Sequence, residues 1–241
     1  MVKLSHSRIQ WAVGKGFFYS STIRCPHHKI RDFNDDETDE FVYVYDCGNE
    51  NPRNTEIVKR EIQEFLNMQK CVKPIPIIDM LVISHFHADH INGVSELFKC
   101  FDVKNLVVPH LKPNEKKLAV LELCAEYEEY GSSIDAMIKF ISNPGEFSMD
   151  FDQKVNIIEF SDSDDNENRS NHDESLYISH DCCRHPIWEF RFFYDNSIDH
   201  KILSPIISKL NKELPRVDLF NSVDIKDNWD KEMWCRGLKG T

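Results

Sequence analysis

Residues 77–94 read Ile-Ile-Asp-Met-Leu-Val-Ile-Ser-His-Phe-His-Ala-Asp-His-Ile-Asn-Gly-Val. The first seven residues are a nearly continuous apolar run, which predicts a buried β-strand. That strand leads directly into three histidines and an aspartate, which lie at positions 85, 87, 89 and 90. Side chains that leave a strand alternate between its two sides, so His85 and His87 can face the same ion. The chain then turns into a helix, whose first residues Asp89 and His90 can face the same space from the other side.

This cluster predicts a metal site. Imidazole and carboxylate groups are suitable ligands for zinc, manganese or iron. The alternative interpretation is an exposed group of histidines without a metal. The position of the group at the end of a buried strand favours the metal site.

The flanking sequence predicts alternating strands and helices. Strands are expected on either side of a turn at Gly14 and Gly16, and at residues 41–45, which precede Asp46-Cys47-Gly48. Spacing of apolar residues predicts helices at 55–69 and 91–101. Further along the chain we expect a strand at 103–108, one long or two shorter helices within 114–142, strands at 155–160, 175–179 and 188–194, and a helix at about 198–213. Charged loops are expected at 31–40 and 161–175. This order predicts an α/β layered fold, in one domain spanning residues 1–241.

Composition excludes some classes of protein. Of the 241 residues, 41% are hydrophobic and 11% aromatic, so the chain can bury a core. The formal net charge of −12 argues against the broad basic surface that binds nucleic acid non-specifically. A phosphodiester substrate stays open, because bound divalent cations would offset charge locally. No apolar run approaches the roughly 20 residues that span a bilayer. Without a secretory signal in residues 1–10, we expect a cytoplasmic protein and no membrane partner.

The eight cysteines do not predict a disulfide framework. Most are dispersed, and a chain of this length does not need such cross-links. We expect reduced and mostly buried thiols at Cys25, Cys47, Cys71, Cys100, Cys124 and Cys235.

Several of these segments together resemble the metallo-β-lactamase superfamily. The hallmark of that family is His-x-His-x-Asp-His after a hydrophobic strand, which matches residues 85–90. Residues 13–18 are similar to the turn of its opening strands, residues 45–48 to its Asp-Cys-Gly element, and residues 92–94 to the start of the following helix. The likeness covers residues 8–110. It implies an αββα sandwich, with the metals at one edge between the sheets.

The resemblance also implies a function. In this family His85 and His87 would bind a first ion, and Asp89 and His90 a second, with two zinc ions expected and manganese or iron as alternatives. The protein would be a hydrolase in which a metal-activated water is the nucleophile and Asp89 is the catalytic residue that orients it. Asp46 would support the histidine loop. The substrate would be a small molecule or a phosphodiester, with phosphodiester or nucleic-acid substrates favoured.

The second half of the chain departs from the family pattern. Members usually add a third histidine for the first metal and a bridging aspartate in a Gly-Asp pair, and this chain has no Gly-Asp. Asp195 follows a predicted strand and could replace the bridging aspartate, and His110 is a candidate for the substrate pocket. The candidates for the third histidine are His172, His180 and His185.

Two explanations of this departure stay open. The chain could be the N-terminal part of a longer protein, with the missing ligands and further domains beyond residue 241. Alternatively, the C-terminal half has diverged and the αββα sandwich is incomplete, which would favour a non-catalytic binding or regulatory module. An iron-dependent redox protein is a weaker alternative, because the extra carboxylate ligands are not evident. Residues 180–185 could also bind a separate structural zinc, although adjacent cysteines seldom share one ion.

Overall fold

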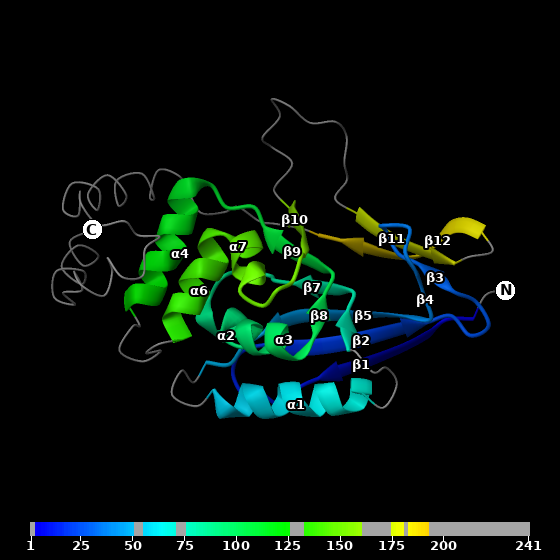
Figure 1. The fold of residues 1–241 in the computed structure, drawn as a ribbon, viewed down its shortest axis with the longest axis horizontal. Coiled ribbons are helices and arrows are strands. Elements are labelled where there is room, and N and C mark those ends of the chain that lie inside the picture. Colours follow the sequence, from blue (N-terminus) through cyan, green and yellow to red (C-terminus); the bar gives the residue numbers. More distant parts are fainter. Residues whose placement is uncertain are drawn as a thin grey trace.

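The computed structural model describes residues 3–50, 55–70, 76–125, 133–160, 175–180 and 183–192 (Figure 1). The first half of the chain contains β1 (Ser5–Gln10), β2 (Phe18–Arg24), β3 (Ile30–Arg31), β4 (Glu37–Thr38), β5 (Glu40–Cys47), α1 (Glu56–Lys70), β6 (Ile77–Ile78), β7 (Met80–Val82), α2 (Ala88–Ile91), α3 (Val94–Cys100), β8 (Asp102–Val103) and β9 (Asn105–Pro109). The second half contains α4 (Pro113–Ala125), α6 (Ser133–Ser142), α7 (Pro144–Met149), β10 (Asn156–Phe160), β11 (Ser175–His180) and β12 (Cys183–Arg191). The predicted alternation of strands and helices is confirmed over these residues.

The larger sheet brings the ends of several strands to one edge. Its order is β1-β2-β5-β7-β9-β10. β1, β2 and β5 pair antiparallel, whereas β5, β7, β9 and β10 run parallel. Each parallel connection contains at least one helix, as crossover connections require. The residues that follow β5, β7 and β9 therefore meet at the same edge of the sheet.

Alternating residues of this sheet build two separate cores. On β5, Val42 and Val44 belong to the cluster that the helices cover, with apolar residues of α1, α3, α4 and α6. Phe41 on the same strand belongs to a second cluster, which also contains Ile178 of β11. The six-stranded sheet is therefore buried on both faces. This explains why its central strands are apolar at nearly every position.

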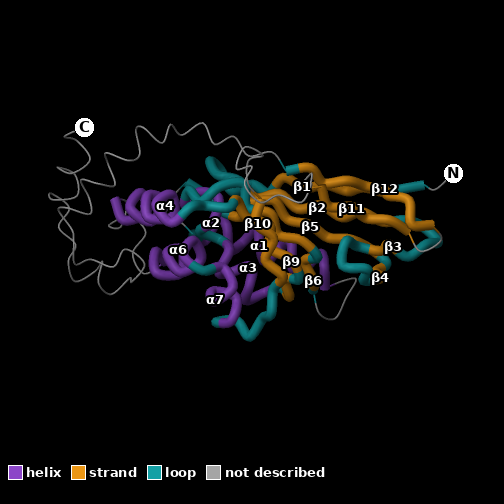
Figure 2. Tube along the Cα trace, turned by 90° about the horizontal axis from the view of Figure 1, so that it is seen from above, coloured by secondary structure: helices purple, strands orange, loops and turns teal. Residues whose placement is uncertain are grey.

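The second face of the large sheet is covered by a smaller one. Its order is β12-β11-β3-β4, and β11 pairs antiparallel with both β12 and β3. The alternating aromatic residues Trp188, Phe190 and Phe192 pack against the second cluster, which confirms that they form a core face. Figure 2 shows helices α4, α6 and α7 at one end of the molecule and the paired strands at the other. The described residues thus form a layer of helices and two layers of sheet, in a mixed α/β fold.

The predicted strand 77–83 is interrupted at Asp79, which is a correction to the sequence prediction. Ile77 and Ile78 pair with β8 in a separate two-stranded sheet, and pairing with the large sheet begins at Met80. Asp79 is buried, and its carboxylate accepts a 2.7 Å hydrogen bond from the backbone N–H of Val42. A side chain that replaces a backbone acceptor interrupts the regular hydrogen bonds between strands. The number of apolar residues in the run 77–83 does not reveal such an interruption.

Other short elements were also missed. The predicted charged loop 31–40 contains β4 and parts of β3 and β5. Helix α7 was not predicted; the side chain of Asn143 caps it by accepting a 3.1 Å hydrogen bond from the N–H of Glu146, and Pro144 follows that cap. The predicted loop 161–175, except for Ser175, and the predicted helix 198–213 lie outside the described residues.

The four cysteines whose side chains the structure describes form no disulfides, as predicted: Cys25, Cys47 and Cys124 are buried and Cys100 is half-buried. Cys71 and Cys235 lie outside the described residues. Among the described helices, none combines the length and apolar character that a membrane crossing needs.

Candidate metal centre

The histidine segment leaves the sheet between two strands and enters a short helix. The N–H of Ile83 still bonds to the carbonyl of Val107 at 2.8 Å, which holds the segment against β9. Phe86 points into the helix-side core, where it contacts Phe140. Because side chains alternate along extended chain, His85 and His87 face the opposite way, with ring centroids 4.6 Å apart. The predicted placement of these two histidines on one side is confirmed.

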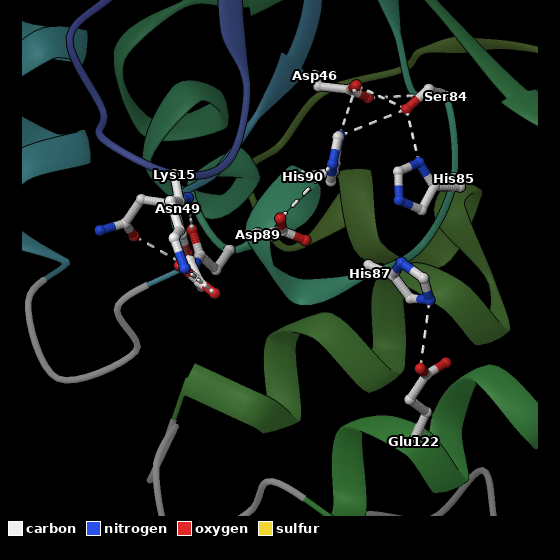
Figure 3. A network of polar contacts seen from close by, with 11 residues as sticks. Lys15, Asp46, Asn49, Ser84, His85, His87, Asp89, His90 and Glu122 are labelled. Carbon is white, nitrogen blue, oxygen red and sulfur yellow. Dashed lines mark hydrogen bonds and ion pairs between the residues drawn. The ribbon is translucent and has the colours of Figure 1, made fainter.

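Four potential ligands converge at this point (Figure 3). One ligand atom from each of His85, His87 and Asp89 lies within 4.8 Å of the others. The ring of His90 is 3.9 Å from that of His85, and its Nε2 lies 3.7 Å from Oδ2 of Asp89. Asp89 is therefore grouped with His85 and His87 and also lies close to His90.

Asp46, at the end of β5, contacts both Ser84 and His90. Its side chain is 1% exposed, and it accepts hydrogen bonds from the N–H of Ser84 at 2.7 Å and the hydroxyl of Ser84 at 2.6 Å. A third contact, of 2.8 Å, joins it to Nδ1 of His90. The backbone of Asp46 is left-handed, with φ of 55°, which aspartate tolerates better than most residues. The predicted supporting position of Asp46 agrees with this geometry.

Each histidine has one ring nitrogen occupied by a polar neighbour. Nδ1 of His85 lies 2.8 Å from the hydroxyl of Ser84, and Nδ1 of His90 contacts Asp46. On His87 the occupied atom is Nε2, which lies 3.3 Å from Oε1 of Glu122 on α4. The other ring nitrogens, Nε2 of His85, Nδ1 of His87 and Nε2 of His90, remain for an ion. An orienting partner on the second nitrogen is the usual arrangement of metal-binding histidines.

Two glycines allow the site to lie close to the opening strands. A Cβ on Gly48 would lie 2.5 Å from the backbone C and O of Asp89. A Cβ on Gly16 would lie 2.7 Å from the same oxygen, and φ at Gly16 is +108°. The N–H of Phe17 bonds to that oxygen at 3.2 Å, and the ring of Phe17 stacks on His90. These close contacts explain the glycines of the two segments that resemble the family's opening turn and Asp-Cys-Gly element.

The site separates the pKa values of two histidines. Burial and the neighbouring rings of His90 and His87 lower the pKa of His85 below its ordinary value. Burial also lowers the pKa of His90, but the hydrogen bond and the negative charge of Asp46 outweigh burial and raise that pKa overall. His85 is therefore neutral and able to bind a metal over a wider pH range than His90.

The donor set fits a divalent transition metal. Three imidazoles and one carboxylate, with the unoccupied ring nitrogens turned to a shared space, are ligands that zinc, manganese and iron accept. The sequence did not point to Ser84 or Glu122. Ser84 adjoins the motif, but a serine there has many possible roles. Glu122 lies on a helix far along the chain, and no local pattern marks it.

The remaining candidates have different outcomes. His110 follows β9, and its Nδ1 lies 2.6 Å from the carboxylate of Glu159. It lines a cavity of about 1050 Å³ at the same sheet edge. The backbone of residue 185 is part of β12, but its side chain and that of His180 lie outside the description, as do residues 172 and 195. The third histidine, the bridging aspartate and the structural zinc at 180–185 therefore stay predictions.

A family model matches the part of the chain that contains the histidine segment. Residues 37–138 match the family model described as the metallo-beta-lactamase superfamily. No curated protein matches the chain. Among solved structures, the chain is similar to the crystal structure of a long form RNase Z from yeast, with 12% identity and a TM-score of 0.30. That likeness covers 64% of this chain and 18% of the RNase Z chain, so the chain spans less than a fifth of that protein's length.

Proposed function

Because residues 37–138 match the model of the metallo-β-lactamase superfamily, we propose that the chain is a metal-dependent hydrolase whose active site contains His85, His87, Asp89 and His90. The observation that carries this proposal is the orientation of the three histidine rings. Each is held through one nitrogen, by Ser84, Glu122 or Asp46. Contacts outside the ligand set thus orient all three rings, which reduces the cost of ordering the ligands when an ion binds.

The residues divide into ligands and supports. His85 and His87 would hold a first ion, and Asp89 and His90 a second; zinc is the proposed metal, and manganese or iron would suit the same donors. Bound ions in such a site activate water and polarise the bond under attack. The proposed catalytic task of Asp89 is to accept a hydrogen bond from the attacking water and so to orient it. Asp46 would keep His90 facing the site.

The proposed substrate is a phosphodiester. The support for it is the resemblance to hydrolases of this class, because the cavity that His110 lines has no excess of positive charge: Lys112, Lys116 and Lys139 are balanced by Asp135, Glu146 and Asp150. Lys139 is paired with Asp150 at 2.7 Å, whereas Lys116 has no ion-pair partner among the described residues. Since β7 pairs with β9, His85 and His110 follow neighbouring strands of the sheet. Divalent ions held by the histidines and Asp89 would offset the charge of an anionic phosphodiester.

Metal content per chain, measured by elemental analysis, is the first test. The wild type should contain about two equivalents of zinc, manganese or iron, and the His87→Ala, Asp89→Ala double variant should lose most of it. A double variant with His27→Asn and Asp102→Asn is the control, because it removes the same residue types at exposed positions of other loops and strands. Asparagine suits the left-handed backbone of His27, where φ is 71°.

Activity should then be measured with bis-(4-nitrophenyl) phosphate, followed by thioester and lactam substrates. Hydrolysis of the phosphodiester by the wild type and control, but not by the site variant, would support the whole proposal. Hydrolysis of the thioester or lactam alone would support the hydrolase proposal and contradict the proposed phosphodiester substrate. Metal binding with no hydrolysis of any class would favour the non-catalytic binding or regulatory module. Only trace metal in the wild type would contradict the metal site itself.

A further inference from the structure

We propose that Glu122 is a positioning residue that selects Nδ1 of His87 as the atom that binds the ion. This inference rests on the proposed metal site and deepens it. Glu122 lies on α4, a crossover helix that carries no residue of the predicted motif. Its Oε1 is 3.3 Å from Nε2 of His87, and Figure 3 shows the carboxylate approaching the ring from the side opposite His85.

Glu122 is placed to act through His87, without itself being a ligand. Among the described residues, the ligand atoms that lie within 4.8 Å of one another come from His85, His87 and Asp89, and Glu122 is outside that group. Glu122 and His87 do line a common small cavity, together with Asp89. The carboxylate therefore contacts the ring on its far side, where it favours a proton on Nε2 and leaves the lone pair on Nδ1.

The other two ligand histidines show why this contact matters. His85 and His90 are held by Ser84 and Asp46, which belong to the same network at the buried end of β5. His87 is outside that network, and its side chain is 57% exposed. Without Glu122 its ring could turn, and its neutral form could carry the proton on either nitrogen. Among the described carboxylates, that of Glu122 lies within ion-pair distance of Nε2 of His87. This contact favours one ring orientation and a proton on Nε2.

Because His87 and Glu122 are both exposed, the effect of Glu122 on metal binding can be measured apart from any effect on folding stability. Both side chains are more than half exposed, at 57% and 60%, and exposed ion pairs contribute little to folding stability. Removing Glu122 should therefore leave the unfolding transition nearly unchanged. Its effect should appear in metal binding, because outer partners of ligand histidines typically change metal affinity about 10- to 100-fold.

The test uses the full chain titrated with Zn²⁺ or Co²⁺ alone, in the wild type and in Glu122→Ala, Glu122→Gln and Glu64→Ala variants. Glu64 is an exposed glutamate on α1, so its variant controls for the loss of one negative charge. We expect Glu122→Ala to bind Zn²⁺ about 10- to 100-fold more weakly. Glu122→Gln should recover part of that loss, because its amide oxygen can accept a hydrogen bond from Nε2. Glu64→Ala should match the wild type.

A spectroscopic measurement identifies the atom concerned. In Zn²⁺-loaded protein, long-range ¹H–¹⁵N spectra should show metal on Nδ1 of His87 in the wild type, and a mixture of the two nitrogens in Glu122→Ala. The visible spectrum of Co²⁺-loaded protein should change in the same variant. Wild-type affinity and unchanged spectra in Glu122→Ala would overturn the inference while leaving the metal site intact. A wild type that binds neither ion would instead overturn the proposed function.

Discussion

Oδ2 of Asp46 lies 2.8 Å from Nδ1 of His90, although 44 residues separate the two in the chain. Asp46 lies at the end of β5 and His90 lies in α2, which follows β7. Because β5 and β7 pair in parallel, both residues lie at the same edge of the sheet. Asp46 is fully buried, so its charge is satisfied by the Ser84 donors and by His90. The contact therefore links the packing of the sheet to the orientation of a candidate metal ligand.

Replacing Asp46 should impair both stability and metal binding. In Asp46→Ala the half-buried N–H of Ser84 loses its acceptor, which costs up to about 1–3 kcal/mol, and alanine tolerates the left-handed backbone poorly. Asp46→Asn should be milder in stability, because its carbonyl can still accept from Ser84. In both variants we expect Zn²⁺ affinity to fall about 10- to 100-fold. Thermal unfolding and Zn²⁺ titration measure the two effects, and unchanged affinity in both variants would exclude the supporting role.

Adding one methyl group at Gly48 should displace the backbone of the candidate ligands Asp89 and His90. The new Cβ would lie 2.5 Å from backbone atoms of Asp89 and 2.7 Å from the N of His90, and backbone gives way less easily than a flexible side chain. We expect Gly48→Ala to cost about 1–3 kcal/mol or more and to lower metal content. Gly145→Ala is the matched control, because its nearest neighbour would be at an ordinary 3.5 Å. Equal melting temperatures and metal content in the two variants would contradict the close approach.

The metal-free protein should show His90 and His85 titrating in a fixed order. The pKa of His90 is raised and that of His85 is lowered, so His90 should lose its proton at the higher pH. The stability that the His90–Asp46 contact contributes should accordingly be present below the unfolded pKa of histidine and be lost as the pH rises through the folded pKa. Histidine ¹H–¹⁵N spectra across pH 4–9 measure the order. His85 titrating above His90 would show that the described charge arrangement is wrong.

The buried thiol of Cys124 should resist alkylation. Burial raises its pKa to about 12, so at pH 8 the native protein holds almost no thiolate at this position. Burial also raises the pKa of Cys47 well above its ordinary value. Iodoacetamide labelling at pH 8, followed by peptide mass spectrometry, should modify the half-buried Cys100 ahead of both. In urea all three should react, and fast labelling of Cys124 without urea would contradict its burial.

The sequence predicted much of the fold because the relevant signals are local. Apolar spacing placed α1, and the run from Ile77 placed a buried strand before the histidines. That run also shows the limit of such signals, because only the bond from Val42 to Asp79 decides that pairing in the large sheet begins at Met80. An aspartate in an apolar strand can face solvent or replace a backbone acceptor, and the choice depends on a neighbouring strand.

The same division holds at the site. The spacing within residues 85–90 determined by itself which side chains meet, because strand alternation and the first turn of a helix are properties of a few consecutive residues. Tertiary structure decided how each ring is turned. Asp46 and Glu122 reach the histidines from a distant strand and a distant helix, and each fixes one nitrogen only after the sheet and its crossover helices have packed. Local geometry can bring ligands together, but the nitrogen that faces the ion depends on contacts between segments far apart in the chain.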